Sequence, residues 1–180
     1  NLEDFFILCG AAGTGKTSLT SALIGYLNAH EIDYTIAAPT GRAARILGRK
    51  TKSISGTIHS RIYTIESDKN TGSVKFKLRP NRNKDFSIFI IDEASMLSSI
   101  SDKSAGMFNA DDSLLNHVRE YIKQGNSRNK VIFLGDKNQL PPINEVESKA
   151  LNPGYLVSNA SNTELEKKRP CFVQWRSRYR

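Results

Sequence analysis

Residues 10–17 read Gly-Ala-Ala-Gly-Thr-Gly-Lys-Thr, and the fold of the chain follows from this stretch and its flanks. The stretch matches the pattern G-x-x-x-x-G-K-[ST]. Residues 5–9 form a short apolar run before it, which indicates a strand buried on both faces. From Lys16 to about His30, leucine and isoleucine recur at helical spacing, which predicts a helix that begins inside the motif. In such an arrangement, backbone N–H groups and the helix N-terminus surround phosphate oxygens.

The motif therefore predicts a site for a nucleoside triphosphate. Lys16 would contact the β- and γ-phosphates, and the Thr17 hydroxyl would bind Mg²⁺. A chance match in a flexible loop is the alternative, and the strand and helix on its two sides argue against it. The predicted ATP-binding residues of this stretch are Gly10, Ala11, Ala12, Gly13, Thr14, Gly15, Lys16 and Thr17.

Three further apolar runs predict strands, at residues 34–38, 86–91 and 131–134. Residues 42–47 and 111–124 have helical periodicity. Four buried strands joined by helical or long connections predict a parallel, doubly wound sheet, so we expect an α/β fold with helices on both faces. Residues 63–78 alternate instead with a period of two around a turn at 68–72, which predicts a β-hairpin.

Two loops that follow predicted strands carry chemistry. Asp92 follows the strand at 86–91, at the strand end where ligands gather in such sheets, and is a candidate metal ligand. Glu93 could act as a base toward an attacking water, unless the pair merely favours the start of the next helix. Gln139, after the strand at 131–134, could donate to a γ-phosphate oxygen and accept from water, although the loop alone could be an ordinary proline turn.

Composition limits the remaining possibilities. The chain has 180 residues and a formal net charge of +8, enough for one ordinary domain. Residues 42–84 carry twelve Lys or Arg against two acids, which indicates either a polyanion partner or a solvated basic face. Two cysteines exclude a disulfide framework. No run of about eighteen apolar residues occurs, so we expect no membrane-spanning segment and a cytoplasmic location.

The motifs together resemble those of superfamily 1B DNA helicases, and in particular the RecD-like branch, which includes exonuclease V alpha-subunit-like proteins. The stretches that carry this resemblance are GAAGTGKT at 10–17, APTGRAA at 38–44, TIHS at 57–60, IIDEAS at 90–95 and GDKNQLPP at 135–142. The resemblance implies a RecA-like P-loop NTPase domain over residues 1–180. It also implies that residues 61–84 are an inserted hairpin that corresponds to the small pin domain of the family.

The resemblance also implies roles for individual residues. Lys16 and Thr17 would hold ATP and Mg²⁺, Asp92 would bind the metal, and Glu93 would activate water. Asp136 and Gln139 would sense the γ-phosphate, and Arg169 would reach it as an arginine finger. Contacts with single-stranded DNA are implied for Pro39, Thr40, Thr57 and His59. The basic block adds Arg42 to these DNA contacts, and Tyr63 is a candidate for stacking on bases.

The sequence thus predicts an ATP-binding and ATP-hydrolysing motor domain of a DNA helicase involved in repair or recombination. It would bind single-stranded DNA without sequence preference, because no groove-reading motif is present. We expect it to need the second RecA-like domain of a longer parent chain, and other nuclease-helicase subunits are possible partners. Two alternatives stay open: a P-loop kinase, and a non-catalytic DNA-binding module gated by ATP.

Overall fold

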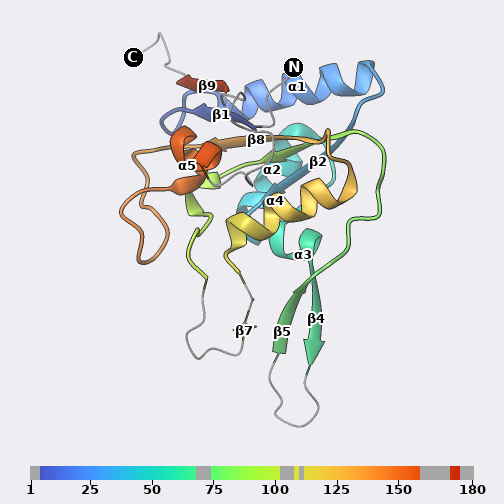
Figure 1. Cartoon of the computed structure of the whole chain (residues 1–180). Coiled ribbons are helices and arrows are strands. Elements are labelled where there is room, and N and C mark those ends of the chain that lie inside the picture. The colour runs from blue at the N-terminus through green and yellow to red at the C-terminus, as the bar shows by residue number, and fades with distance from the viewer. Residues whose placement is uncertain (1–4, 68–73, 102–107, 110–111, 159–170, 175–180) are drawn as a thin grey trace.

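A parallel sheet forms the centre of the protein (Figure 1). The computed structural model describes residues 5–67, 74–101, 108–109, 112–158 and 171–174. The sheet has six strands in the order β3-β2-β6-β8-β1-β9, and all neighbours pair in parallel. The strands are β1 (Phe5–Cys9), β2 (Asp33–Ala38), β3 (Ser55–Thr57), β6 (Ser87–Ile91), β8 (Lys130–Gly135) and β9 (Cys171–Gln174).

Helices cover both faces of this sheet. On one face, α1 (Lys16–Ala29) packs against α2 (Gly41–Thr51). The other face is covered by α3 (Ile58–Ile62), α4 (Leu114–Gly125) and α5 (Pro153–Ser158), and α4 crosses in front of the sheet in Figure 1. Two short 3₁₀ helices, η1 (Ala94–Met96) and η2 (Lys149–Leu151), lie in the connections. None of the helices within the described ranges is long and apolar enough to cross a membrane.

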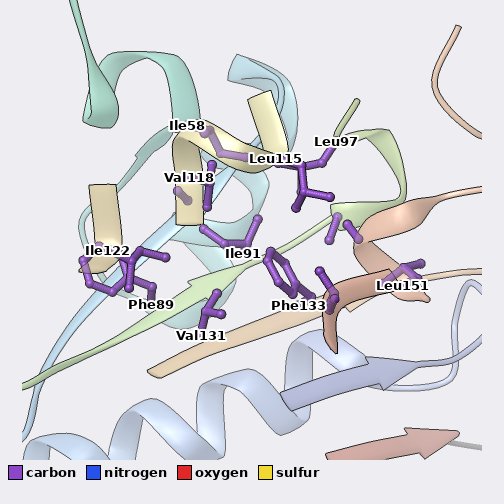
Figure 2. Packing of buried hydrophobic residues seen from close by; sticks show 14 of the residues in the cluster. Ile58, Phe89, Ile91, Leu97, Leu115, Val118, Ile122, Val131, Phe133 and Leu151 are labelled. Carbon is purple, nitrogen blue, oxygen red and sulfur yellow. The ribbon is translucent and has the colours of Figure 1, made fainter. Parts of the chain in front are cut away.

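The apolar strands feed two separate cores, because successive side chains point to opposite faces. Ile91 and Phe133 pack with α3, α4 and α5, and Phe133 is fully buried. Figure 2 shows both side chains in a cluster that includes Ile58 of α3 and Val118 of α4. Ile90 and Leu134, each one position away, pack with α1 and α2. A strand that is buried on both faces needs apolar residues at every position, which is why these strands read as continuous runs.

The predicted fold class is confirmed. The four predicted strands are present in the six-stranded sheet, together with two that the sequence did not predict. The sequence predicts no strand between the helical stretch at 42–47 and the hairpin at 63–78, yet β3 lies there and pairs with β2 at the sheet edge. Strand β9, in a segment without resemblance to the helicases, pairs with β1 at the other edge, with Phe6 opposite Cys171. Both additions are edge strands, whose pairing depends on the neighbouring strand more than on their own pattern.

The predicted hairpin is also present. Strands β4 (Tyr63–Ser67) and β5 (Val74–Leu78) pair antiparallel, with Ile65 opposite Phe76. Strand β7 (Phe108–Asn109) adds to β5 in parallel and completes a second, three-stranded sheet. The predicted turn at 68–72 lies outside the described residues. The boundaries of the inserted unit, 61–84, and of the ATPase domain, 1–180, stay predictions.

An aromatic contact fixes the base of the hairpin onto the main domain. Tyr63 is 5% exposed, and its hydroxyl lies 2.8 Å from Nδ1 of His117 on α4. The Tyr63 ring also contacts the rings of Phe76 and His59, at centroid distances of 5.4 and 5.6 Å. Burial, with a smaller effect of the charge of Asp112, raises the pKa of Tyr63 to about 12, so the buried phenol stays neutral at physiological pH.

Replacing Tyr63 with phenylalanine should destabilise the fold. The Tyr63→Phe change keeps the ring packing but leaves a buried nitrogen of His117 without its partner, which costs about 1–3 kcal/mol. Urea denaturation would measure the lost free energy of unfolding. Tyr26→Phe is the matched control, because Tyr26 is 56% exposed and should be neutral. Equal stability of the Tyr63→Phe and wild-type proteins would contradict the role of this contact.

Candidate active site

The loop between β1 and α1 has a backbone shape that depends on two glycines. Gly13 and Gly15 have φ angles of 78° and 92°, in the left-handed region that side chains other than glycine rarely adopt. The loop is anchored to the end of β8, because the Gly10 N–H donates to the Gly135 carbonyl at 3.1 Å and the Ala12 N–H donates to Oδ2 of Asp136 at 3.1 Å. The predicted phosphate loop therefore has a fixed form.

Lys16 lies over this loop. Its ammonium group donates to the carbonyl oxygens of Gly10, at 2.6 Å, and Ala11, at 3.0 Å. An ammonium group has three N–H donors, so the two loop carbonyls position the charge and use two of these donors. Thr17 follows in the first turn of α1, whose N-terminus carries a partial positive charge.

The carboxylate pair follows β6, two strands away from β1. The Asp92 N–H donates to the Ala37 carbonyl at 2.9 Å, and the Glu93 N–H donates to Oδ1 of Asp92 at 3.0 Å. Glu93 has a φ of 51°, left-handed although it is not glycine. Such strained residues cluster at functional sites, where the surrounding structure holds them in place.

Both carboxyl groups are shifted toward their neutral forms. Burial raises the pKa of Asp92, and this rise is opposed by the hydrogen bond from the Glu93 N–H and by the charges of Lys16 and Lys50. Burial and the neighbouring charge of Asp92 raise the pKa of Glu93, with Lys16 and a hydrogen bond to Gln139 acting in the opposite direction. A carboxylate with a raised pKa is a stronger base toward water.

Gln139 is held next to this pair by the loop after β8. Its N–H donates to the Asp136 carbonyl at 3.2 Å, and its Oε1 accepts from the Ser95 hydroxyl at 3.1 Å. Ser95 belongs to η1, directly after Glu93. The side chains of Gln139 and Glu93 are therefore tied to one another through both a direct and an indirect contact.

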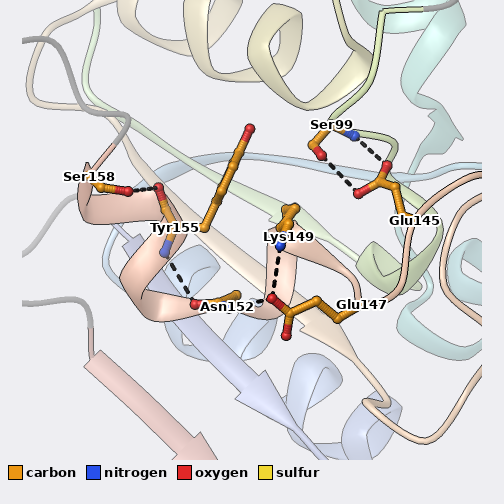
Figure 3. A network of polar contacts seen from close by, with 7 residues as sticks. All are labelled: Ser99, Glu145, Glu147, Lys149, Asn152, Tyr155 and Ser158. Atoms are coloured by element: carbon orange, nitrogen blue, oxygen red, sulfur yellow. Dashed lines mark hydrogen bonds and ion pairs between the residues drawn. The ribbon is translucent and has the colours of Figure 1, made fainter.

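A second contact joins the same two loops further out, as Figure 3 shows. The N–H and the hydroxyl of Ser99 donate to the two carboxylate oxygens of Glu145, at 2.7 and 2.8 Å. Nearby, Glu147 accepts from Lys149 and Asn152 at 2.9 Å each. The contact between Ser99 and Glu145 fixes the loop after β6 relative to the loop after β8, whereas the Glu147 contacts lie within the segment after β8.

The loops enclose a cavity of about 630 Å³, within the size range of small-molecule sites. Five predicted catalytic or metal-binding residues line it together, namely Lys16, Thr17, Asp92, Glu93 and Gln139, and the predicted phosphate-loop residues Ala12, Gly13 and Gly15 line it with them. A glycine-shaped loop, a lysine and a helix N-terminus fit a nucleotide polyphosphate. The sequence predicted that these residues would lie close together, because each follows the carboxyl end of a parallel strand.

The donor set also fits Mg²⁺. Among the described residues, no three His, Cys, Asp or Glu side chains gather in a way that could hold a metal ion by themselves. Thr17 and Asp92 line the same cavity, and Mg²⁺ typically takes one or two protein ligands and completes its shell with phosphate and water. These two residues would hold the metal beside a bound nucleotide.

Asp136 lies beside the phosphate loop and outside the cavity lining. It is 6% exposed, and its two carboxylate oxygens accept from the N–H groups of Ala12 and Asn138, at 3.1 and 2.9 Å. A carboxylate so engaged supports the phosphate loop, and its role in sensing the γ-phosphate stays a prediction. Arg169, the predicted arginine finger, lies outside the described residues.

The predicted DNA contacts divide into two groups. Pro39 and Thr57 lie at the carboxyl ends of neighbouring strands, since Ala38 pairs with Thr57, and His59 is exposed beside them. Thr40 and Arg42 instead line the cavity. The prediction of base stacking by Tyr63 is wrong, because the side chain is buried against α4 and has no face free for a base.

Sequence reasoning missed part of the cavity wall. Ile46, Lys50 and Met96 line it, and Ile46 and Met96 are 44% and 47% exposed. The sequence could have indicated the part of the wall that α2 forms. Arg42, Ile46 and Lys50 are spaced by four residues and so lie along one side of a helix.

This fold and this site define a P-loop NTPase domain. Residues 2–145 match the family described as an AAA domain, and the chain belongs to that family. It is 27% identical over 137 residues to the ATP-dependent RecD2 DNA helicase of Deinococcus radiodurans. It is 32% identical over 136 residues to the ATP-dependent DNA helicase Pif1 of Psychrobacter sp. (strain PRwf-1). Each match covers 76% of this chain.

A third relative is an uncharacterized protein, MJ1519, of Methanocaldococcus jannaschii, 32% identical over 178 residues that cover 93% of this chain. The chain spans only 16% of the RecD2 helicase, 19% of the Pif1 helicase and 13% of MJ1519. The prediction of a superfamily 1 helicase-like P-loop domain is confirmed by the family and the two helicases. Its placement in the RecD-like, exonuclease V branch stays a prediction.

Replacing Asp92 with asparagine should stabilise the domain in metal-free buffer. Because burial raises the pKa of Asp92, the folded state binds its proton more tightly than the unfolded state, and the charged form lowers stability at neutral pH. Thermal unfolding should therefore give a higher Tm for Asp92→Asn at pH 7. The difference should shrink as the pH falls through the raised pKa. The exposed Asp33→Asn is the control, and an unchanged or lower Tm for Asp92→Asn would contradict this account.

Proposed function

We propose that this domain binds ATP with Mg²⁺ and hydrolyses it as a motor domain of an ATP-dependent DNA helicase. The observation that carries the proposal is the single cavity lined by Lys16, Thr17, the Asp92-Glu93 pair and Gln139. A nucleotide-binding protein needs the first two, whereas hydrolysis also needs a base and a group that orients water. All of these groups meet in one place.

Each residue of the site has a separate role in the proposed hydrolysis of ATP. The loop of residues 10–15 and the α1 N-terminus bind the polyphosphate, and Lys16 adds its charge. Thr17 and Asp92 would hold Mg²⁺, which would neutralise charge on the phosphate oxygens. Glu93, whose pKa is raised by burial, accepts a proton from the attacking water, and Gln139 orients that water or the γ-phosphate.

The proposed partner is single-stranded DNA, bound without sequence preference. Pro39, Thr57 and His59 lie together at the carboxyl ends of β2 and β3 and support this proposal, as does the excess of basic residues over 42–84. Each phosphate neutralised would contribute about −0.7 to the log-log salt slope. The similar helicases are much longer than this chain, so we propose that unwinding also needs a second RecA-like domain, with nuclease-helicase subunits as further candidate partners.

Lys16→Ala should weaken binding of a non-hydrolysable ATP analogue by roughly tenfold or more, because charge-assisted hydrogen bonds to phosphate are lost. Isothermal titration calorimetry on this chain measures the affinity, and circular dichroism checks the fold. Arg45→Ala is the control, since Arg45 is exposed and does not line the cavity. Unaltered affinity of the Lys16→Ala protein would refute the assignment of the phosphate loop.

Glu93→Gln should abolish hydrolysis and leave ATP binding intact. The amide keeps the size of the side chain but cannot accept the proton, so turnover should fall on the order of 10²- to 10⁴-fold. Phosphate release would be measured on the natural full-length protein with and without single-stranded DNA. Transfer of labelled phosphate to an acceptor other than water would point to a kinase. A wild-type protein without DNA-stimulated hydrolysis would point to a binding module.

A further inference from the structure

One side of α2 faces the cavity. Ala44, Leu47 and Thr51 are buried against the domain. Arg42, Ile46 and Lys50 recur every four residues and all line the cavity. The helix has two further cations, Arg45 and Arg49, which are exposed and lie outside the cavity lining.

A cap fixes where α2 begins, and contacts at its end and along its length hold it against α1. At the start of the helix, Oγ1 of Thr40 accepts from the Ala43 N–H at 3.2 Å as an N-cap. At its end, the Ser21 hydroxyl on α1 donates to the Lys50 carbonyl at 3.3 Å. Between them, Leu47 packs in the same core as Ile24 of α1. Because α1 begins at Lys16, the cations of α2 are held in a set place beside the triphosphate site.

These two cations also set the sign of the charge that the protein side chains bring to the cavity. Without them, Lys16 is the single side-chain cation lining the cavity beside the carboxylates of Asp92 and Glu93, so the lining by itself, before Mg²⁺ binds, would carry a net negative charge. Arg42 and Lys50 reverse the sign, with three cations against two carboxylates. Among the ion pairs of the described residues, none includes Arg42 or Lys50, although the charge of Lys50 acts on Asp92 from a distance.

We propose that Arg42 and Lys50 bind the phosphate groups of the nucleoside triphosphate, and that Arg42 is not a DNA contact. This proposal rests on the proposed function and deepens it, because it extends the nucleotide site from the phosphate loop onto α2. A guanidinium group suits bidentate contact with phosphate, and an ammonium group adds a point charge.

The test compares two double variants of one helix. Arg42→Ala with Lys50→Ala removes the cavity cations, and Arg45→Ala with Arg49→Ala removes the same number of charges from positions outside the cavity. Affinities for a non-hydrolysable ATP analogue with Mg²⁺, and for AMP, are measured by calorimetry. Affinity for a single-stranded oligonucleotide is measured by fluorescence anisotropy. Circular dichroism verifies that each variant folds, and the single change Lys50→Gln serves as a milder second test.

The cavity variant should bind the ATP analogue roughly tenfold or more weakly, with a smaller loss for AMP, while the control variant keeps its ATP affinity. The charge-conserving pair Arg42→Lys with Lys50→Arg should recover most of the loss. Equal losses in the cavity and control variants would overturn the proposal, because a general field effect would explain both. An equal loss for AMP and the ATP analogue would overturn the phosphate assignment.

Failure of this inference is distinguishable from failure of the proposed function. If Lys16→Ala weakens nucleotide binding and the cavity variant does not, the inference is wrong and the function stands. If the cavity variant loses DNA affinity alone, Arg42 and Lys50 are DNA contacts. If the wild-type chain does not bind the ATP analogue, the proposed function fails, and this inference fails with it.

Discussion

Parallel pairing of buried strands is the constraint on which the rest of this protein depends. It places the carboxyl ends of β1, β2, β6 and β8 at one edge of the sheet, so the loops that follow them converge. Each loop brings a different chemical group, and no single segment of the chain contains the site. This arrangement requires continuous apolar runs in the sequence, because helices cover both faces of the sheet and leave little room for solvated side chains on its strands.

Convergence alone would not set the geometry, and hydrogen bonds between loops do so. Asp136 joins the loop after β8 to the phosphate loop, and Ser95 and Ser99 join the loop after β6 to that after β8. Asp136 and Ser95 are both buried, where a polar group is tolerated only with a partner. Hydrogen bonds therefore connect the three loops, and a movement of one loop would disturb its hydrogen bonds to the next.

The sequence predicts the parts of this structure that are encoded locally. Strand runs, the phosphate loop and the Asp92-Glu93 pair are readable because apolar periodicity and motif spacing involve neighbouring residues. Placement of a side chain against a distant element is not readable in this way. The burial of Tyr63 depends on His117, 54 positions further along the chain, and the role of Asp136 depends on Ala12, 124 positions earlier. Likewise, the pairing of β9 with β1 joins the two ends of the described chain.

The left-handed backbone of Glu93 sets a limit on how this domain could be improved. Stability alone would favour glycine or asparagine at such a φ angle, because a larger side chain is strained there. Neither residue can accept a proton from water at neutral pH. Any selection or redesign that rewards only thermal resistance would thus drift away from a carboxylate at this position, and screening for melting temperature would enrich for proteins that lack the proposed base.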